Sequence, residues 1–272
     1  MFHPSDFSEG SEVAFAHALK IALVAAAGLD VLHVSERRDR NWTEFPRVRG
    51  MLERWRVLPP NSPRQAVASI GIDVRKVQMK DSDPVRAAER FLEKNPTDLV
   101  VLAAHAHQGH MRWTRASISQ PISRAAGAAT LFIPYGCQGF ISQADGSASL
   151  RSVLLPIDSA PRPEPAVEAA RRLTWALQCP EVTFTMLHVG STGEMPSVQT
   201  EEQPGWAWKR VTRNGEVVDT IIAVARECAA DLIVMTTAGR NGFLDALRGS
   251  TTERVLRSGV APLLAIPAAA HS

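Results

Sequence analysis

Short runs of consecutive apolar residues alternate along this chain with stretches in which apolar residues recur every three or four positions. The first pattern is typical of strands buried on both faces of a sheet, and the second of amphipathic helices. Because strands and helices alternate, we expect an α/β fold with an open, mostly parallel sheet and helices on both faces. In the second half the patterns predict strands at 153–157, 182–189, 209–212, 232–235 and 263–266, and helices at 165–177, 217–228 and 252–258.

The chain contains one internal repeat. Shifting the sequence by 133 residues aligns residues 98–134 with residues 231–267, and eleven of the 37 aligned positions are identical. Repetition over this length predicts two domains of the same fold, each with a five-stranded sheet. We expect these domains at residues 1–140 and 150–270. The first is longer than the second, and its extra residues fall among 35–69.

Both halves end in an apolar strand that is closed by a proline, at residues 131–134 and 263–267. An unprotected apolar strand edge tends to pair with another strand. We therefore predict that these two strands pair with each other across a pseudo-two-fold axis within the chain.

Composition restricts the class of protein. With 45% hydrophobic and 21% charged residues, the 272-residue chain has the composition of a globular protein. Its 30 basic residues nearly balance 28 acidic ones, which argues against a nucleic-acid binder. Three widely spaced cysteines, Cys137, Cys179 and Cys228, predict neither a disulfide framework nor a zinc site, so we expect a cytoplasmic protein. The apolar run at 21–29 is too short to cross a membrane, and the acidic segment 1–12 is unlike a signal peptide.

The most informative motif is a glycine-framed loop after the strand predicted at 232–235. It reads Gly239-Arg240-Asn241-Gly242 and continues, six residues later, as Gly249-Ser250-Thr251. Glycine lets backbone N–H groups approach a ligand closely, and a helix start presents unpaired N–H donors. Ser250 and Glu253 have the spacing of a capping box, which supports a helix start here. The loop is a candidate phosphate site, although glycine-rich turns also follow strands as simple connections.

These motifs, together with Asp158 after the first strand of the second half and His188-Val189 at the end of the next, resemble the universal stress protein family in its tandem form. The resemblance covers nearly the whole chain. It implies Rossmann-like (adenine nucleotide alpha hydrolase-like) domains that bind ATP, ADP or AMP, with Mg²⁺ as a candidate companion ion. It also implies that the Asp158 carboxylate accepts the ribose hydroxyls and that the Val189 backbone meets the adenine edge. The implied site comprises Pro156, Asp158, Val189, Gly239, Arg240, Gly242, Gly249, Ser250 and Thr251.

The first half departs from this motif. Alanines, Ala106 and Ala116, replace two of the glycines, and Pro121 matches Arg254. A proline four residues beyond the serine that should begin the helix removes an N–H, so we expect the helix start to move toward Ser119. We therefore predict a degenerate first site and one nucleotide per chain. The residues of this degenerate site are Asp6, Val34, Gly109 and Ser117.

Two groups of histidines are further candidates for chemistry. His105, His107 and His110 lie close together, but no carboxylate or cysteine nearby completes a ligand set, so we expect no metal site. His33 and His188 occupy matching strand ends, and we expect them to be hydrogen-bonded structural residues rather than catalysts.

The leading hypothesis is a regulator or sensor of stress that binds ATP or a related adenine nucleotide in its second half. Two alternatives stay open: an interaction module whose sites are both empty, and a slow ATPase or self-phosphorylating protein that uses Ser250 or Thr251. No P-loop, Rossmann fingerprint, nucleophile elbow or zinc-protease motif is present in the sequence. We expect a protein partner that the sequence does not identify, with a homodimer as a candidate assembly, and no membrane or nucleic-acid partner.

Overall fold

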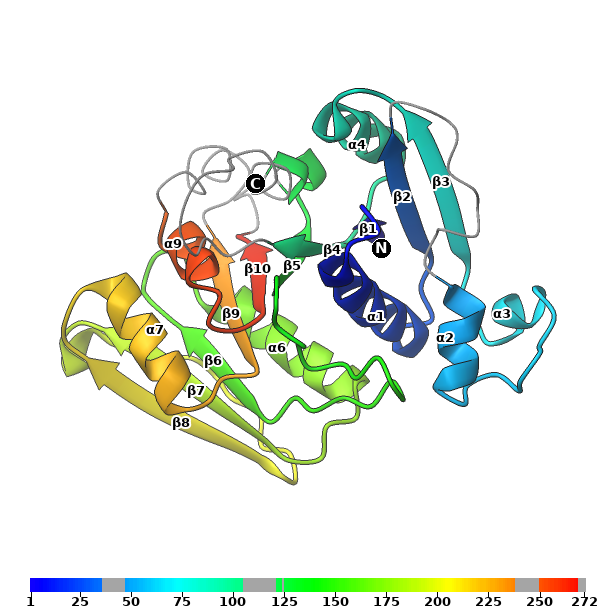
Figure 1. Ribbon diagram of the computed structural model, residues 1–272. Coiled ribbons are helices and arrows are strands. Elements are labelled where there is room, and N and C mark those ends of the chain that lie inside the picture. Colours follow the sequence, from blue (N-terminus) through cyan, green and yellow to red (C-terminus); the bar gives the residue numbers. More distant parts are fainter. Residues whose placement is uncertain (36–46, 105–120, 124, 238–249, 269–272) are drawn as a thin grey trace.

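The computed structural model of the chain has an α/β fold built around one sheet (Figure 1). The residues that the structure describes are 1–35, 47–104, 121–123, 125–237 and 250–268. In the first half the elements are β1 (Phe2–Pro4), α1 (Glu9–Val24), β2 (Leu29–Ser35), α2 (Val48–Arg54), α3 (Ala66–Ser69), β3 (Val74–Lys80), α4 (Pro84–Lys94), β4 (Leu99–Ala104) and β5 (Ala129–Pro134).

The second half repeats this order without the helices that follow β2. Its elements are β6 (Ser152–Pro156), α6 (Glu164–Ala176), β7 (Val182–Val189), a short 3₁₀ turn η2 (Thr192–Glu194), β8 (Trp206–Arg213), α7 (Val217–Glu227), β9 (Leu232–Thr237), α9 (Thr251–Ser258) and β10 (Leu263–Pro267). Most predicted elements of this half therefore lie within two residues of their observed bounds.

All the strands named above join in one sheet with the order β3-β2-β1-β4-β5-β10-β9-β6-β7-β8. Neighbouring strands within each half are parallel. The halves meet at β5 and β10, which run antiparallel and pair Phe132 with Leu263 and Leu131 with Leu264. The predicted pairing of the two terminal strands is confirmed, and so is the α/β fold with five strands from each half.

Helices cover both faces of the sheet, and each face has its own apolar core. On one face α1 and α6 pack against the central strands, joined by α2, and bury residues such as Phe15 and Phe184. On the other face lie α4, α7 and α9, with buried residues such as Phe91 and Leu256. Among the described helices, none has both the length and the apolar character needed to span a bilayer.

The extra residues of the first half include α2 and α3, which lie between β2 and β3. At the end of α2 the buried Trp55 directs its indole toward the segment that connects the two halves, and its Nε1–H donates to the carbonyl oxygen of Gln143 at 3.2 Å. The insertion therefore helps to fix the connecting segment, residues 135–151.

A second residue, His17 on α1, fixes the same connecting segment. Its Nδ1–H donates to the carbonyl oxygen of Val13 (2.8 Å), and its Nε2 accepts the backbone N–H groups of Phe140 (3.0 Å) and Ile141 (3.2 Å). This arrangement requires a neutral ring with the proton on Nδ1. Burial lowers the pKa of His17 to about 4, so the ring is neutral at physiological pH.

Two details differ from the sequence prediction or extend it. β8 begins at Trp206 rather than at residue 209, because Trp206 and Trp208 pack their rings against Phe184 of β7, with centroids 5.2 and 4.3 Å apart. In the first half the described helical residues that precede β5 start at Pro121, while the predicted helix start, Ser119, lies outside the described residues.

Candidate functional site

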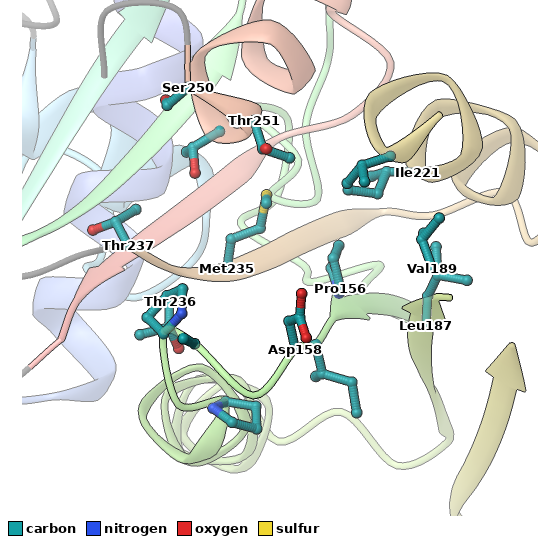
Figure 2. A pocket seen from close by; sticks show the side chains of 16 residues that line it. Pro156, Asp158, Leu187, Val189, Ile221, Met235, Thr236, Thr237, Ser250 and Thr251 are labelled. Atoms are coloured by element: carbon teal, nitrogen blue, oxygen red, sulfur yellow. The ribbon is translucent and has the colours of Figure 1, made fainter. Parts of the chain in front are cut away.

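A cavity of about 250 Å³ opens in the second half at the carboxyl ends of β6, β7 and β9. In an open parallel sheet this edge is where ligands bind. The beginnings of α7 and α9 close the cavity from above the sheet, and Figure 2 shows Ser250 and Thr251 at the start of α9 facing the space over β9. The lining residues are Pro156, Ile157, Asp158, Ala160, Pro161, Pro163, Leu187, Val189, Val217, Ile221, Met235, Thr236, Thr237, Ser250, Thr251 and Thr252.

Five residues that the sequence implicated line this one cavity: Pro156, Asp158, Val189, Ser250 and Thr251. They come from the end of β6, the end of β7 and the start of α9, and are separated by up to 95 positions in the chain (156 to 251). The other implicated residues, Gly239, Arg240, Gly242 and Gly249, lie outside the described residues.

The start of α9 has the geometry of a capped helix. Ser250 is the N-cap with an extended backbone, and its Oγ accepts the N–H of Glu253 at 3.1 Å. The N–H groups of Thr251 and Thr252, which precede Glu253, have no acceptor within the helix itself. Thr251 and Thr252, at the first two helical positions, line the cavity, so this helix start borders a space that suits an anionic or hydroxyl-bearing ligand.

Asp158 supplies the only carboxylate among the described lining residues. It follows β6 directly, and its Oδ1 accepts the N–H of Ser159 at 2.7 Å. The carboxylate is exposed, so its oxygens can accept hydrogen bonds from a ligand. No lysine or arginine stands among the described lining residues.

The remaining wall is apolar, and of the residues described here only Val189 was identified from the sequence. Leu187 and Val189 project from β7 at alternate positions, Val217 and Ile221 come from α7, and Met235 comes from β9. Strand alternation and helical spacing could have identified Leu187 and Ile221 once Val189 was placed in the site. A flat aromatic base fits such a wall, because apolar side chains pack against its faces.

The two helices above the cavity are joined by a polar contact. Glu216 is the N-cap of α7: its Oε2 accepts the N–H groups of Val218 and Asp219, and its Oε1 accepts from Arg254 of α9 at 3.0 Å. The hydrogen bond from the Asp219 amide, with the nearby Arg254 guanidinium, lowers the pKa of Glu216. Pro121, which matches Arg254 in the first half, cannot make this contact.

The first half carries a different arrangement at the matching strand ends. Asp6 uses its Oδ1 to accept the N–H and the hydroxyl of Ser8, at 3.0 and 2.6 Å, at the start of α1. The next residue, Phe7, stacks its ring on His33 with centroids 4.1 Å apart. Of the other residues of the predicted degenerate site, Val34 ends β2, whereas Gly109 and Ser117 lie outside the described residues.

His33 and His188 are buried, and each hydrogen-bonds a backbone carbonyl through Nδ1. The distances are 2.8 Å from His33 to Ser5 and 3.3 Å from His188 to Ile157. These contacts tie the loop after the first strand of each half to the neighbouring strand. They agree with the structural role predicted for both histidines. His105, His107 and His110 lie outside the described residues.

The sequence profile of the Universal stress protein family matches residues 3–134 and 197–267. Among solved structures, a universal stress protein from Archaeoglobus fulgidus DSM 4304 is similar to this chain at 18% identity and a TM-score of 0.61, covering 98% of this chain and 97% of that one. A protein of unknown function from Pseudomonas aeruginosa PAO1 is similar at 14% identity and a TM-score of 0.60, covering 98% and 92%. At these identities the two structures support the fold alone, and among curated proteins none matches the sequence. The profile match covers most of the chain in two segments, one in each half, and the chain therefore belongs to the universal stress protein family.

Proposed function

We propose that this universal stress protein binds ATP or a related adenine nucleotide in the cavity of its second half and acts as a regulator or sensor of stress. One observation carries the proposal. Asp158, Val189 and the start of α9, which the family resemblance implies as contacts for ribose, adenine and phosphate, line the same cavity.

The chemistry of the lining supports this ligand. The cavity has an apolar wall of β7 and α7 residues for the base, a carboxylate that accepts sugar hydroxyl protons, and helix-start N–H groups with hydroxyl side chains for phosphate oxygens. Its volume of about 250 Å³ lies just below the range of about 300–1,000 Å³ that is ordinary for small-molecule sites, which suits a nucleoside moiety with the phosphates extending outward.

The two halves differ in ways that support one site per chain. Each aspartate accepts hydrogen bonds from a nearby serine, Asp6 from Ser8 and Asp158 from Ser159, but in the first half the neighbouring Phe7 ring stacks on His33. In the second half the matching position to Phe7 is Ser159, a small residue that leaves Asp158 at the cavity. We therefore propose that the second half alone binds the nucleotide.

Calorimetric titration of the full chain with ATP, ADP, AMP and adenosine tests the proposal, and Asp158→Asn with Asp6→Asn provides a matched pair. We expect one nucleotide per chain in the unmodified protein. Asp158→Asn should weaken binding about tenfold to a hundredfold, because a charge-assisted hydrogen bond contributes about 1.5–3 kcal/mol. Asp6→Asn keeps the Oδ1 acceptor for Ser8 and should leave binding unchanged.

The alternatives give different results in the same preparation. Absence of binding by all four ligands would contradict the proposal and favour an interaction module. Phosphate release from ATP above background, abolished by Asp158→Asn, would favour a slow ATPase. Two equivalent sites, or equal effects of the two aspartate variants, would refute the assignment to the second half.

A further inference from the structure

β9 ends in two threonines whose hydroxyl groups have different surroundings. Both side chains line the cavity. The hydroxyl of Thr237 donates to the carbonyl oxygen of Ile266 on β10 at 3.3 Å. The hydroxyl of Thr236 is shielded from solvent and has no hydrogen-bond partner among the residues that the structure describes. Of these two neighbouring threonines, only Thr237 therefore has a hydrogen-bond partner for its hydroxyl within the described residues.

A buried hydroxyl without a partner destabilises a protein, so its presence calls for an explanation. The fold of the sheet does not require a hydroxyl group at this position. With the shift of 133 residues that relates the halves, Thr236 and Thr237 match Ala103 and Ala104 at the end of β4, where the strand has the same length and parallel neighbours. The two hydroxyls occur in the half that has the described cavity, and one of them already has a protein partner.

The position of Thr236 points to the part of a ligand that it would meet. β6 and β9 are parallel with Leu154 beside Ile233, so residues 155–158 and 234–237 advance together to the same edge of the sheet. Side chains alternate along a strand, which places Thr236 on the opposite side of β9 from Met235 and Thr237. Figure 2 shows Thr236 and Asp158 on one side of the β9 ribbon, and Ser250 and Thr251 on the other.

Electrostatics favour a hydroxyl over a phosphate on the side that Asp158 occupies. A carboxylate repels a phosphate, and among the described lining residues it has no cation to offset its charge. A sugar diol, by contrast, offers two hydroxyl groups, one of which can donate to the carboxylate while the other exchanges a hydrogen bond with a threonine.

We propose that Thr236 is a specificity-determining residue of the ligand site, whose hydroxyl binds one hydroxyl of the ligand's sugar diol while Asp158 binds the other. This inference rests on the proposed function. It adds a residue outside the glycine loop and explains why a buried hydroxyl is retained without a protein partner.

The test compares Thr236→Val with Thr237→Val, since valine keeps the shape of threonine and removes the hydroxyl. In the ligand-free protein Thr236→Val should raise the midpoint of thermal unfolding by about 2–4 °C, because it removes an unsatisfied buried group. Thr237→Val should lower it, because it removes the hydrogen bond from the Thr237 hydroxyl to the Ile266 carbonyl. The two variants thus have opposite expected signs.

Binding to adenosine and to ATP is then measured by calorimetry. Thr236→Val should weaken both about fivefold to tenfold, the value of one neutral hydrogen bond. The same measurement is made with 2′-deoxyadenosine and 3′-deoxyadenosine, each of which lacks one hydroxyl of the diol. The analogue that lacks the hydroxyl bound by Thr236 should bind the unmodified protein and Thr236→Val with equal affinity.

The outcomes separate this inference from the proposed function. If the unmodified protein binds adenosine and Thr236→Val binds it equally well, Thr236 has no role and only the inference is overturned. If the variant loses affinity for ATP but not for adenosine, the hydroxyl serves phosphate and the diol assignment is wrong. If the unmodified protein binds none of these ligands, the proposed function fails and the inference fails with it.

Discussion

Replacing Gly139 with alanine should disrupt the connection between the two halves. Gly139 has a φ of +67°, and a Cβ built on it would lie 2.3 Å from both Cε1 and Nε2 of His17. Atoms cannot approach so closely, so the ring must move. Because Nε2 accepts the N–H groups of Phe140 and Ile141, moving the ring also removes both hydrogen bonds.

The size of the effect follows from these contacts. An alanine in the left-handed region costs about 1–2 kcal/mol. Each buried N–H that loses its acceptor costs about 1–3 kcal/mol. The sum is about 3–8 kcal/mol, a large part of the total stability of an ordinary domain. Gly136 provides a matched control, because its φ is +81° but a Cβ there meets nothing within 4 Å. Gly136→Ala should therefore cost only the backbone term of about 1–2 kcal/mol.

Urea unfolding followed by tryptophan fluorescence measures these differences, and Trp55, bonded to the same connecting segment, reports locally. A His17→Ala background completes the design. Without the ring, Gly139→Ala should cost no more than Gly136→Ala, and the paired measurement remains possible if the single variant folds poorly. Equal costs for Gly139→Ala with and without His17, or equal costs at Gly139 and Gly136, would refute the argument.

Two further predictions concern stability. Burial lowers the pKa values of His3 and His17 from 6.5 to about 4, so the unfolded chain binds more protons between these pH values. The free energy of unfolding should therefore be highest above pH 6.5 and should fall by about 3 kcal/mol per histidine as the pH is lowered toward 4. Urea titrations at several pH values measure this fall, and His17→Ala should remove about half of it. A free energy of unfolding that does not change with pH would contradict the prediction. Leu264→Lys should destabilise the protein by more than about 3 kcal/mol, because Leu264 is only 5% exposed and lies beside Leu131 in the strand pair that joins the halves. Trp175→Lys, at a position that is 69% exposed, should change thermal stability little. Equal effects of the two variants would argue against this interface.

The sequence predicted the architecture well for a physical reason. Strands buried on both faces must be nearly continuous apolar runs, so segments such as 182–189 and 232–235 can be recognised as strands from the sequence. The repeat then supplied the pairing of β5 with β10, because an apolar strand at the end of each half needs a partner. The start of β8 was missed, since Trp206 and Trp208 follow Pro204-Gly205 and join the strand through packing on Phe184.

The site was predictable only where residue type alone carries the chemistry. Asp158 and Ser250 are recognisable as an acceptor and a helix cap, and both line the cavity. The distinction between Thr236 and Thr237 could not be predicted, because it depends on which hydroxyl lies near the Ile266 carbonyl of another strand. Contacts such as that of His17 with Phe140 join residues 123 positions apart and leave no local pattern.

The shared sheet explains how one half can keep a cavity while the other diverges. β10 lies between β5 of the first half and β9 of the second, and its Leu263 is fully buried. β9 lines the cavity and pairs with β10, and α9, whose start also lines the cavity, leads into β10. The first half covers the other edge of β10, so it supports the site whether or not the first half itself binds a ligand. Residues of the first half that hold the sheet and the connecting segment, such as Leu131 and His17, are constrained by packing. The two halves differ instead at the strand ends, where Phe7 stacks on His33 in the first half and Ser159 takes the matching position in the second.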